Sequence, residues 1–241
     1  MRSPAVSVVV PVFNEAGAAG ALAEEIAAAF EGVDAEILFV DDASTDETVA
    51  LLAALKLRLP TLRILRHGRN AGQSRAVRTG VLAARAEVIV TLDGDGQNDP
   101  ADAPRLARRL LEGPQTLALV GGRRRRRRDT LAKRLASRLG NGVRKALLHD
   151  EADDTGCGLK AFRRDAFLRL PYFDHIHRYL PALFLREGFE TAFEDVNHRP
   201  RLSGVSKYSN IGRLWVSLTD LLGVMWLRTR ARSPGSVVEA T

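Results

Sequence analysis

The 241-residue chain contains a single cysteine, Cys157. One cysteine cannot form an internal disulfide and provides no cluster for zinc, so nothing in the sequence requires an oxidising compartment. The first apolar run begins at Val6, without the charged region, apolar core and cleavage site of a secretory signal. We therefore expect a protein that is not exported and works in the reducing cytoplasm.

The chain also lacks a long apolar segment. The best candidate, residues 214–227, is interrupted by Asp220, whereas a membrane-spanning helix needs about 18 uncharged apolar residues. Residues 211–230 instead predict an amphipathic helix with tryptophans near both ends. Such a helix either lies on a membrane or packs against the domain or a membrane partner. The small and polar residues 231–241 predict a disordered tail.

Aromatic residues are scarce, at 6%, and acidic residues are outnumbered, which gives a net charge of +7. This excess indicates anionic partners such as nucleic acid, a lipid headgroup surface or phosphorylated small molecules. Nucleic acid is not expected, because the sequence has no recognised binding motif and no interleaved aromatic platform. The arginine run at residues 123–128, taken alone, is typical of a solvated loop or a nucleic-acid patch.

The first half of the chain alternates between short apolar runs and helical periods. This pattern predicts strands at residues 6–10, 35–40, 62–65 and 87–92, with helices at residues 19–30, 44–59 and 73–84. We therefore expect one α/β domain with a mainly parallel sheet flanked by helices. The less regular second half predicts helices at 101–111 and 131–148, a strand at 117–120, a strand and helix after residue 158, and an extended segment at 192–200.

Polar residues follow three of the predicted strands: Asn14-Glu15, Asp41-Asp42 and Asp93-Gly94-Asp95. Ligands bind beyond the carboxyl ends of strands in such sheets. The paired carboxylates of Asp93 and Asp95 would repel each other unless a cation lies between them. Their hard oxygens suit Mg²⁺ or Mn²⁺, which bridges to substrate phosphates, and Gln97 offers a further amide oxygen. An alternative is a surface turn rich in aspartate and glycine.

The motif Asp41-Asp42 has no third ligand at metal spacing. One of its carboxylates is better suited to the ribose or base of a nucleotide. Alternatively, both residues cap the helix that begins near Ser44.

The ordered set of motifs resembles family 2 glycosyltransferases, and within them the polyprenyl-phosphate branch. The motifs are Pro11-Val12-Phe13-Asn14-Glu15, Val40-Asp41-Asp42-Ala43-Ser44-Thr45-Asp46, Asn70-Ala71-Gly72, Asp93-Gly94-Asp95-Gly96-Gln97, Gly121-Gly122-Arg123, Asp154-Thr155-Gly156-Cys157-Gly158 and Arg201 to Tyr208. The resemblance spans residues 5–210 and is more specific than any single motif. It implies a GT-A catalytic domain at residues 1–210, with a donor and metal half at about 1–120 and an acceptor half at about 121–210.

The resemblance also implies roles for individual residues. The nucleotide of a GDP- or UDP-sugar would be bound by Pro11, Phe13, Glu15, Asp41 and Asp42. Mg²⁺ or Mn²⁺ would be held by Asp93, Asp95 and Gln97, and the diphosphate by Arg201 and Lys207. The acceptor phosphate would be bound by Arg123, Lys133, Arg134 and Ser137. Of these, Asp95, Arg123 and Arg201 are expected to act in catalysis.

The implied reaction is transfer of a sugar to a polyprenyl phosphate by direct displacement with inversion. A phosphate acceptor is already ionised, so positioning and charge stabilisation do most of the catalysis. The expected location is the cytoplasmic face of a membrane, in bacteria the inner membrane, with a membrane subunit or a second copy as a further partner. Alternatives are a family 2 enzyme that acts on a sugar hydroxyl and a basic nucleic-acid-binding protein.

Some residues fall outside this pattern. Arg124 to Arg128 exceed the Gly-x-Arg motif, and attraction of about 1 kcal/mol per basic residue to anionic lipid would suit them. Cys157 is expected to be a buried small hydrophobe. Asp154 either orients an arginine of the site or caps a turn. We expect structural or surface roles for the remaining histidines considered, which are His149, His175, His177 and His198.

Overall fold

The computed structural model describes residues 3–124, 154–200 and 210–231, together with residues 142, 144, 145, 147, 148, 150 and 152. For residues 210–217 it describes the backbone. The strands are β1 (Val6–Val12), β2 (Ala35–Asp41), β3 (Leu62–Arg66), β4 (Val88–Thr91), β5 (Leu117–Arg124), β6 (Lys160–Arg163) and β7 (Glu190–Val196). The α-helices are α1 (Ala16–Ala29), α2 (Thr48–Lys56), α3 (Gln73–Ala83), α4 (Ala103–Leu111), α6 (Arg164–Arg169), α7 (Leu180–Arg186) and α8 (Asn210–Thr229). Two short 3₁₀ turns are η1 (Pro100–Asp102) and η2 (Ile176–Arg178).

The strands form one seven-stranded sheet in the order β3-β2-β1-β4-β6-β5-β7. Among the strands that the structure describes, only β6 runs against its neighbours, because it pairs antiparallel with both β4 and β5. The remaining pairs are parallel. The predicted α/β fold with a mainly parallel sheet is therefore confirmed, with β6 inserted between the two halves.

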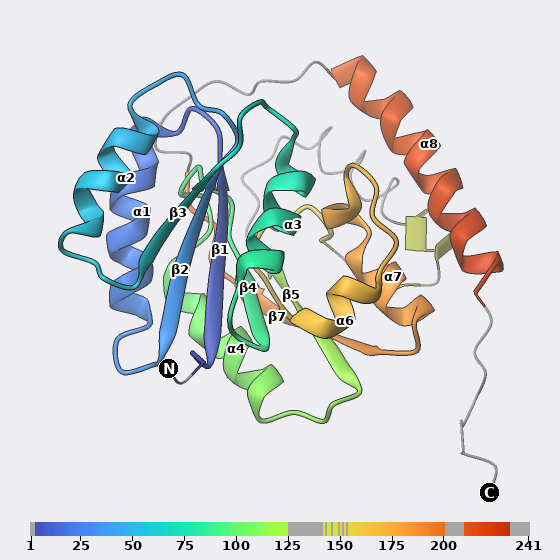
Figure 1. Cartoon of the computed structure of the whole chain (residues 1–241). Coiled ribbons are helices and arrows are strands. Elements are labelled where there is room, and N and C mark those ends of the chain that lie inside the picture. The colour runs from blue at the N-terminus through green and yellow to red at the C-terminus, as the bar shows by residue number, and fades with distance from the viewer. Residues whose placement is uncertain are drawn as a thin grey trace, which may run out of the picture.

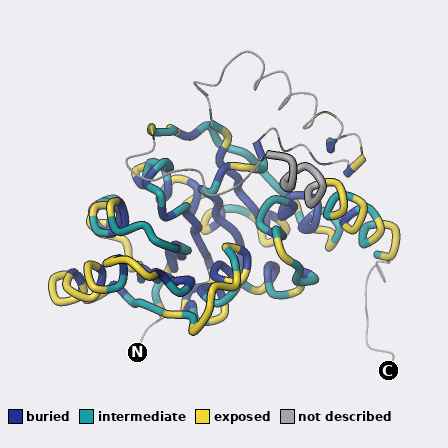
Figure 2. Tube along the Cα trace, turned by 90° about the horizontal axis from the view of Figure 1, so that it is seen from above, coloured by how far each residue is buried: buried dark blue, intermediate teal, exposed yellow. Residues whose placement is uncertain are grey.

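Helices cover both faces of the sheet (Figure 1). Successive strand residues point to opposite faces, so Val8 joins a core with α1, α2 and α4, whereas Val9 joins a core with α3, α6, α7 and α8. Seen from above in Figure 2, buried strands lie between helices whose outer sides are exposed. Gly80 allows α3 to lie close against the sheet, since a Cβ there would collide with Val9.

The boundaries of several elements differ from the predicted ones. β5 extends beyond residue 120 through Arg124, so the first two arginines of the run belong to a strand and not to a loop. The helix predicted from residue 44 begins at Thr48, because Ser44 accepts a hydrogen bond from the Asn14 amide and Asp46 accepts one from the Ala16 amide at the start of α1. The predicted extended segment at 192–200 is β7 and the residues after it.

The predicted C-terminal helix is present as α8. Within the described residues, no helix is sufficiently long and apolar to cross a membrane. The predicted division of the chain at residues 210 and 230, and the predicted tail, stay predictions.

Candidate functional site

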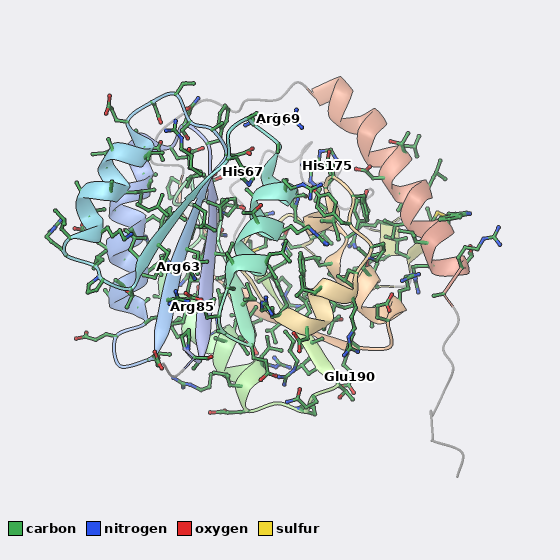
Figure 3. The ribbon with its side chains drawn as sticks, viewed as in Figure 1. Arg63, His67, Arg69, Arg85, His175 and Glu190 are labelled. Atoms are coloured by element: carbon green, nitrogen blue, oxygen red, sulfur yellow. The ribbon has the colours of Figure 1, made fainter. Side chains whose placement is uncertain are left out.

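The carboxyl ends of β1, β2 and β4 lie next to one another at one edge of the sheet. Val12 pairs with Asp41 at the end of β1 and β2, and Val9 pairs with Thr91 near the end of β4. The three acidic motifs therefore gather at this edge, as the parallel arrangement requires. In Figure 3 His67, which follows β3, marks the same end of the sheet, whereas Arg63 and Arg85 lie lower.

The loop after β4 is held in one conformation by its own side chains. The Asp93 amide donates to Asn98 Oδ1 at 3.0 Å, and the Gln97 amide donates to Asp95 Oδ1 at 3.1 Å. Gly94 has no room for a side chain, because a Cβ there would lie 2.6 Å from Val12 Cγ1 and 2.8 Å from the Pro11 carbonyl. The loop thus places Gln97 next to Asp95, and the charge of Asp95 acts on Asp93. The predicted metal binding by these three residues stays a prediction.

The carboxyl group of Asp93 is packed against the protein backbone. A Cβ on Gly158 would lie closer than 3.0 Å to three atoms of that group, and Gln73 Nε2 donates to Asp93 Oδ1 at 2.8 Å. Burial raises the pKa of Asp93, the charge of Asp95 raises it further, and Lys160, Arg124 and Gln73 oppose the rise. Negative charge at this point is therefore incompletely compensated by the protein.

This chemistry fits Mg²⁺ or Mn²⁺ held by few protein ligands. Among the residues that the structure describes, no group of three or more His, Cys, Asp or Glu side chains could hold a metal ion. The two carboxylates and the Gln97 amide would leave coordination positions for phosphate oxygens and water, as magnesium sites commonly do. The uncompensated charge at Asp93 is what a cation would neutralise.

Asp42 is engaged by the protein itself. Its Oδ1 contacts His67 Nδ1 at 2.7 Å and accepts a hydrogen bond from the Ala71 amide at 2.9 Å, while Oδ2 accepts from the Gly72 amide at 2.7 Å. The side chain is buried. Asp42 therefore fixes the loop that leads into α3, and its predicted contact with a nucleotide stays a prediction. His67 lies outside the sequence motifs, so no pattern predicts its contact with Asp42.

Asp41 is fully buried, accepts from the Ser44 amide at 3.2 Å and lies 3.3 Å from Arg66 Nε. Because α2 begins at Thr48 and has Glu47 at its N-cap position, Asp41 holds the turn before the helix and does not cap the helix itself. Asn14 has a left-handed backbone with φ of 54°. Its amide donates to Ser44 Oγ, and its Oδ1 accepts from the Thr45 amide, both at 2.8 Å. The motifs after β1 and β2 are thus joined in one structure, beside which Pro11, Phe13 and Glu15 lie partly exposed.

A small pocket lies beneath Asp93. Its volume of about 20 Å³ is enough for a water molecule, and its lining includes Pro11, Gln73, Asp93, Gly158, Lys160 and His177. Lys160 Nζ donates to the carbonyls of Cys157 and Thr155. Burial lowers the pKa of Lys160, and the nearby Cys157 and Asp93 oppose this. The sequence signal for this lysine was a charged residue between Leu159 and Ala161, inside an apolar run.

The histidines behave differently from one another. His177 lines the pocket, and its Nδ1 lies 2.7 Å from Ser74 Oγ. Burial, then the charges of Lys160 and Arg178, lower its pKa well below the usual value, so the ring is neutral at neutral pH. His175 contacts Asp220 of α8 at 3.0 Å. These structural contacts agree with the expectation for both residues, while His149 lies outside the described residues.

The first two arginines of the run point in different directions, because they are neighbours on a strand. Arg123 Nε donates to Asp195 Oδ1 of β7 at 2.7 Å, and its side chain is 44% exposed. The side chain of Arg124 is 12% exposed, and its Nε and Nη2 each donate a hydrogen bond of 2.6 Å to the Asp154 carboxylate. The expectation that Arg124 attracts lipid is therefore wrong: it is a buried ion-pair partner whose charge acts on Asp93. Asp154 does orient an arginine.

Five predicted site residues lie outside the described residues, namely Lys133, Arg134, Ser137, Arg201 and Lys207, and so do Arg125 to Arg128. The described chain just before Arg201 lies against the loop that follows β4. The Arg199 amide donates to the Gln97 carbonyl at 2.9 Å, and His198 forms an isolated antiparallel bridge with Asn98. Cys157 is buried, as expected, and burial raises the pKa of its thiol.

Comparison with known families gives a match between residues 7–170 and the model described as Glycosyl transferase family 2. The dodecaprenyl-phosphate galacturonate synthase of Rhizobium johnstonii is 34% identical over 240 residues, which cover 98% of this chain and 70% of that protein. The undecaprenyl-phosphate 4-deoxy-4-formamido-L-arabinose transferase of Enterobacter sp. is 37% identical over 211 residues, which cover 85% of this chain and 62% of the relative. The chain thus matches less than two thirds of that transferase.

Solved structures with the same fold include the mannosyl-3-phosphoglycerate synthase of Rubrobacter xylanophilus, with a TM-score of 0.71 and 20% identity over 97% of this chain and 79% of that one. The glucosyl-3-phosphoglycerate synthase of Mycobacterium tuberculosis, in complex with Mn²⁺, uridine diphosphate and glucosyl-3-phosphoglycerate, has a TM-score of 0.70 and 19% identity over 96% and 82% of the two chains. At such identities the likeness concerns the fold, and it confirms the predicted GT-A architecture.

Proposed function

The chain belongs to glycosyltransferase family 2, and from this premise we propose that it transfers a sugar from a nucleoside-diphosphate sugar to a polyprenyl phosphate. The observation that carries the donor half is the pair Asp93 and Asp95 at the carboxyl edge of the sheet, where the pKa of Asp93 is raised by burial and by Asp95. The acceptor is inferred from the relatives, whose names specify dodecaprenyl and undecaprenyl phosphates.

On the donor side, Asp93, Asp95 and Gln97 would hold Mg²⁺ or Mn²⁺, which, when bound, neutralises the diphosphate as it leaves. Metal and uridine diphosphate occur together in the complex of the Mycobacterium tuberculosis synthase, which supports this pairing of ligands. The Asp42 loop would lie beside the nucleotide, and Pro11, Phe13 and Glu15 would line its pocket. Both UDP- and GDP-sugars fit the proposal.

In this reaction the described residues would position the substrates, and proton transfer would play a smaller part. An oxygen of the acceptor phosphate attacks the anomeric carbon, the bond from that carbon to the diphosphate breaks, and the nucleoside diphosphate departs. A phosphate nucleophile needs no strong general base, which agrees with a neutral His177 that is engaged with Ser74. Inversion follows from a single displacement.

Binding of the acceptor phosphate is assigned to Arg123, with Lys133, Arg134 and Ser137, and binding of the diphosphate to Arg201 and Lys207. The contact between Arg199 and Gln97 supports the second assignment, because it brings the segment just before residue 201 to the loop that follows β4. The reaction would take place at the cytoplasmic face of a membrane, where a lipid acceptor and a soluble donor meet.

The deciding experiment is a panel of UDP- and GDP-sugars incubated with undecaprenyl phosphate and either Mn²⁺, Mg²⁺ or a chelator. We expect nucleoside diphosphate and a glycosylated lipid to appear together, only with metal, and we expect Asp95→Ala to abolish both. The proposal would be contradicted if release of nucleoside diphosphate did not depend on the lipid phosphate and proceeded equally well with a sugar hydroxyl as the acceptor. Full activity of Asp95→Ala would contradict the metal assignment.

A further inference from the structure

Helix α8 has two apolar sides, of which one is used within the domain. On the inner side Val224 is buried, and Leu221, Met225 and Leu227 pack against the core that contains α3, α6 and α7. Arg186 Nε of α7 also donates to the Leu227 carbonyl at 2.9 Å. The helix is therefore docked on the domain, in agreement with the packing alternative of the sequence analysis.

The outer side of the same helix carries a second apolar row. Leu218, Leu222 and Trp226 are 47%, 56% and 58% exposed, and their spacing of four residues aligns them along the helix. We call these three residues the outer row. Large side chains exposed in a row on one helix differ from singly scattered surface leucines, and they mark a surface that contacts something apolar.

The charges around the outer row are unusual for a solvated helix. Among the side chains described in α8, the one acidic residue is Asp220. Its Oδ2 lies 3.0 Å from Nδ1 of His175 on the inner side of the helix, and Figure 3 shows His175 beside α8. The exposed neighbours of the row are Thr219, Gly223, Thr229 and Arg230. The guanidinium of Arg230 lies 5.8 Å from the centre of the Trp226 ring. The described outer side is therefore uncharged or cationic.

We propose that the outer row of α8 lies in the headgroup region of an anionic lipid bilayer and holds the enzyme at the membrane that contains its acceptor. This inference rests on the proposed function, because it names the surface through which the enzyme reaches a lipid substrate. A helix with an apolar side, tryptophan at the boundary and arginine near its end has the features of helices that bind at an interface. Tryptophan and arginine also suit the headgroup level.

The placement of α8 favours lipid over a protein partner. Figure 1 shows that α8 begins level with the carboxyl edge of the sheet, where the site lies, and runs down one flank of the domain. A bilayer against this flank would bring lipid phosphates to the level of the site. The net charge of +7 would favour an anionic surface in the same way. A protein partner that requires ion pairs would find no carboxylate among the exposed side chains described in α8.

Sedimentation with vesicles tests this surface directly. The full chain is incubated with vesicles of phosphatidylcholine alone or with phosphatidylglycerol, and the bound fraction is compared for Leu222→Glu, Trp226→Ala and the control Leu57→Glu. Leu57 is 90% exposed at the end of α2. We expect each outer-row variant to lose about tenfold or more in partitioning to anionic vesicles, since each removes one apolar side chain that would be buried in the bilayer. The control should bind as the wild type does.

A second measurement separates this inference from the proposed function. Transfer to undecaprenyl phosphate in vesicles should fall in the outer-row variants, while transfer to a short, water-soluble prenyl phosphate should be unchanged. Loss of both activities in a folded Leu222→Glu protein would overturn the inference, and absence of any transfer in the wild type would instead contradict the proposed function. Unchanged vesicle binding, or a dimer that dissociates in these variants during sedimentation, would also overturn it.

Discussion

Replacing Gly158 by alanine should disable the proposed metal site without unfolding the protein. The backbone at Gly158 does not have a positive φ, so alanine is conformationally allowed there. Its Cβ, however, would lie closer than 3.0 Å to the Asp93 carboxyl group. Cβ atoms in proteins essentially never come so close to another heavy atom. Either the carboxyl group or the loop of residues 155–158 must move by about 1 Å, and a displacement of that size can cost about 100-fold in rate.

The expected stability cost is that of overpacking, about 1–3 kcal/mol, so the variant should still fold. Titration with Mn²⁺ by calorimetry should show an affinity at least tenfold weaker, and kcat/KM should fall by about 100-fold. The control is Gly68→Ala, where a Cβ would meet nothing within 4 Å and where stability should change little or rise by about 0.4–1 kcal/mol. Wild-type metal affinity and activity in Gly158→Ala would refute the close dependence of Asp93 on this backbone.

Three further predictions concern charged side chains. Arg124→Lys should destabilise the fold by about 1–3 kcal/mol, because lysine cannot form the bidentate hydrogen bonds that Arg124 makes with Asp154. The control Arg123→Lys, on the exposed side of the strand, should lower the thermal midpoint much less. Because the pKa of Asp93 is raised, protons should compete with Mn²⁺ at a higher pH than they do at an ordinary carboxylate. The affinity for Mn²⁺ should therefore begin to weaken before the pH has fallen to about 4, the usual pKa of an aspartate. Constant affinity between pH 7.5 and 5 in calorimetry would contradict this. Asp42→Asn should lower stability without any ligand by about 1–3 kcal/mol, since the amide cannot replace both acceptor oxygens, and an unchanged denaturant midpoint would argue against its role in fixing the loop.

The first half of the fold and the acidic edge could be predicted from the sequence, because apolar runs and strand-end aspartates follow local rules. The strand order could not. β6 lies between β4 and β5 and runs against both, and this insertion brings Gly158 and Lys160 beneath Asp93. Residues more than sixty positions apart meet there through pairing that no local pattern encodes. Gly158 was thus recognisable as part of a motif, but its contact with Asp93 was not.

The arginine run shows a different limit of sequence reasoning. Six identical residues have no hydrophobic alternation, so the continuation of β5 through Arg124 left no trace in the periodicity. Once β5 is extended, alternation decides which arginine is exposed and which is buried. The Gly-x-Arg motif favoured Arg123, yet it is the next residue whose charge acts on Asp93.

The aspartates at or just after the ends of β2 and β4 differ in their surroundings. Asp42 receives two backbone amides and His67, and Asp41 receives the Ser44 amide. At Asp93, burial and the charge of Asp95 outweigh Lys160, Arg124 and the Gln73 amide, so the pKa of Asp93 remains raised. A carboxylate whose charge the protein leaves partly unbalanced gains most from an added cation. This difference in compensation, more than the number of aspartates, supports the proposed metal site at the end of β4.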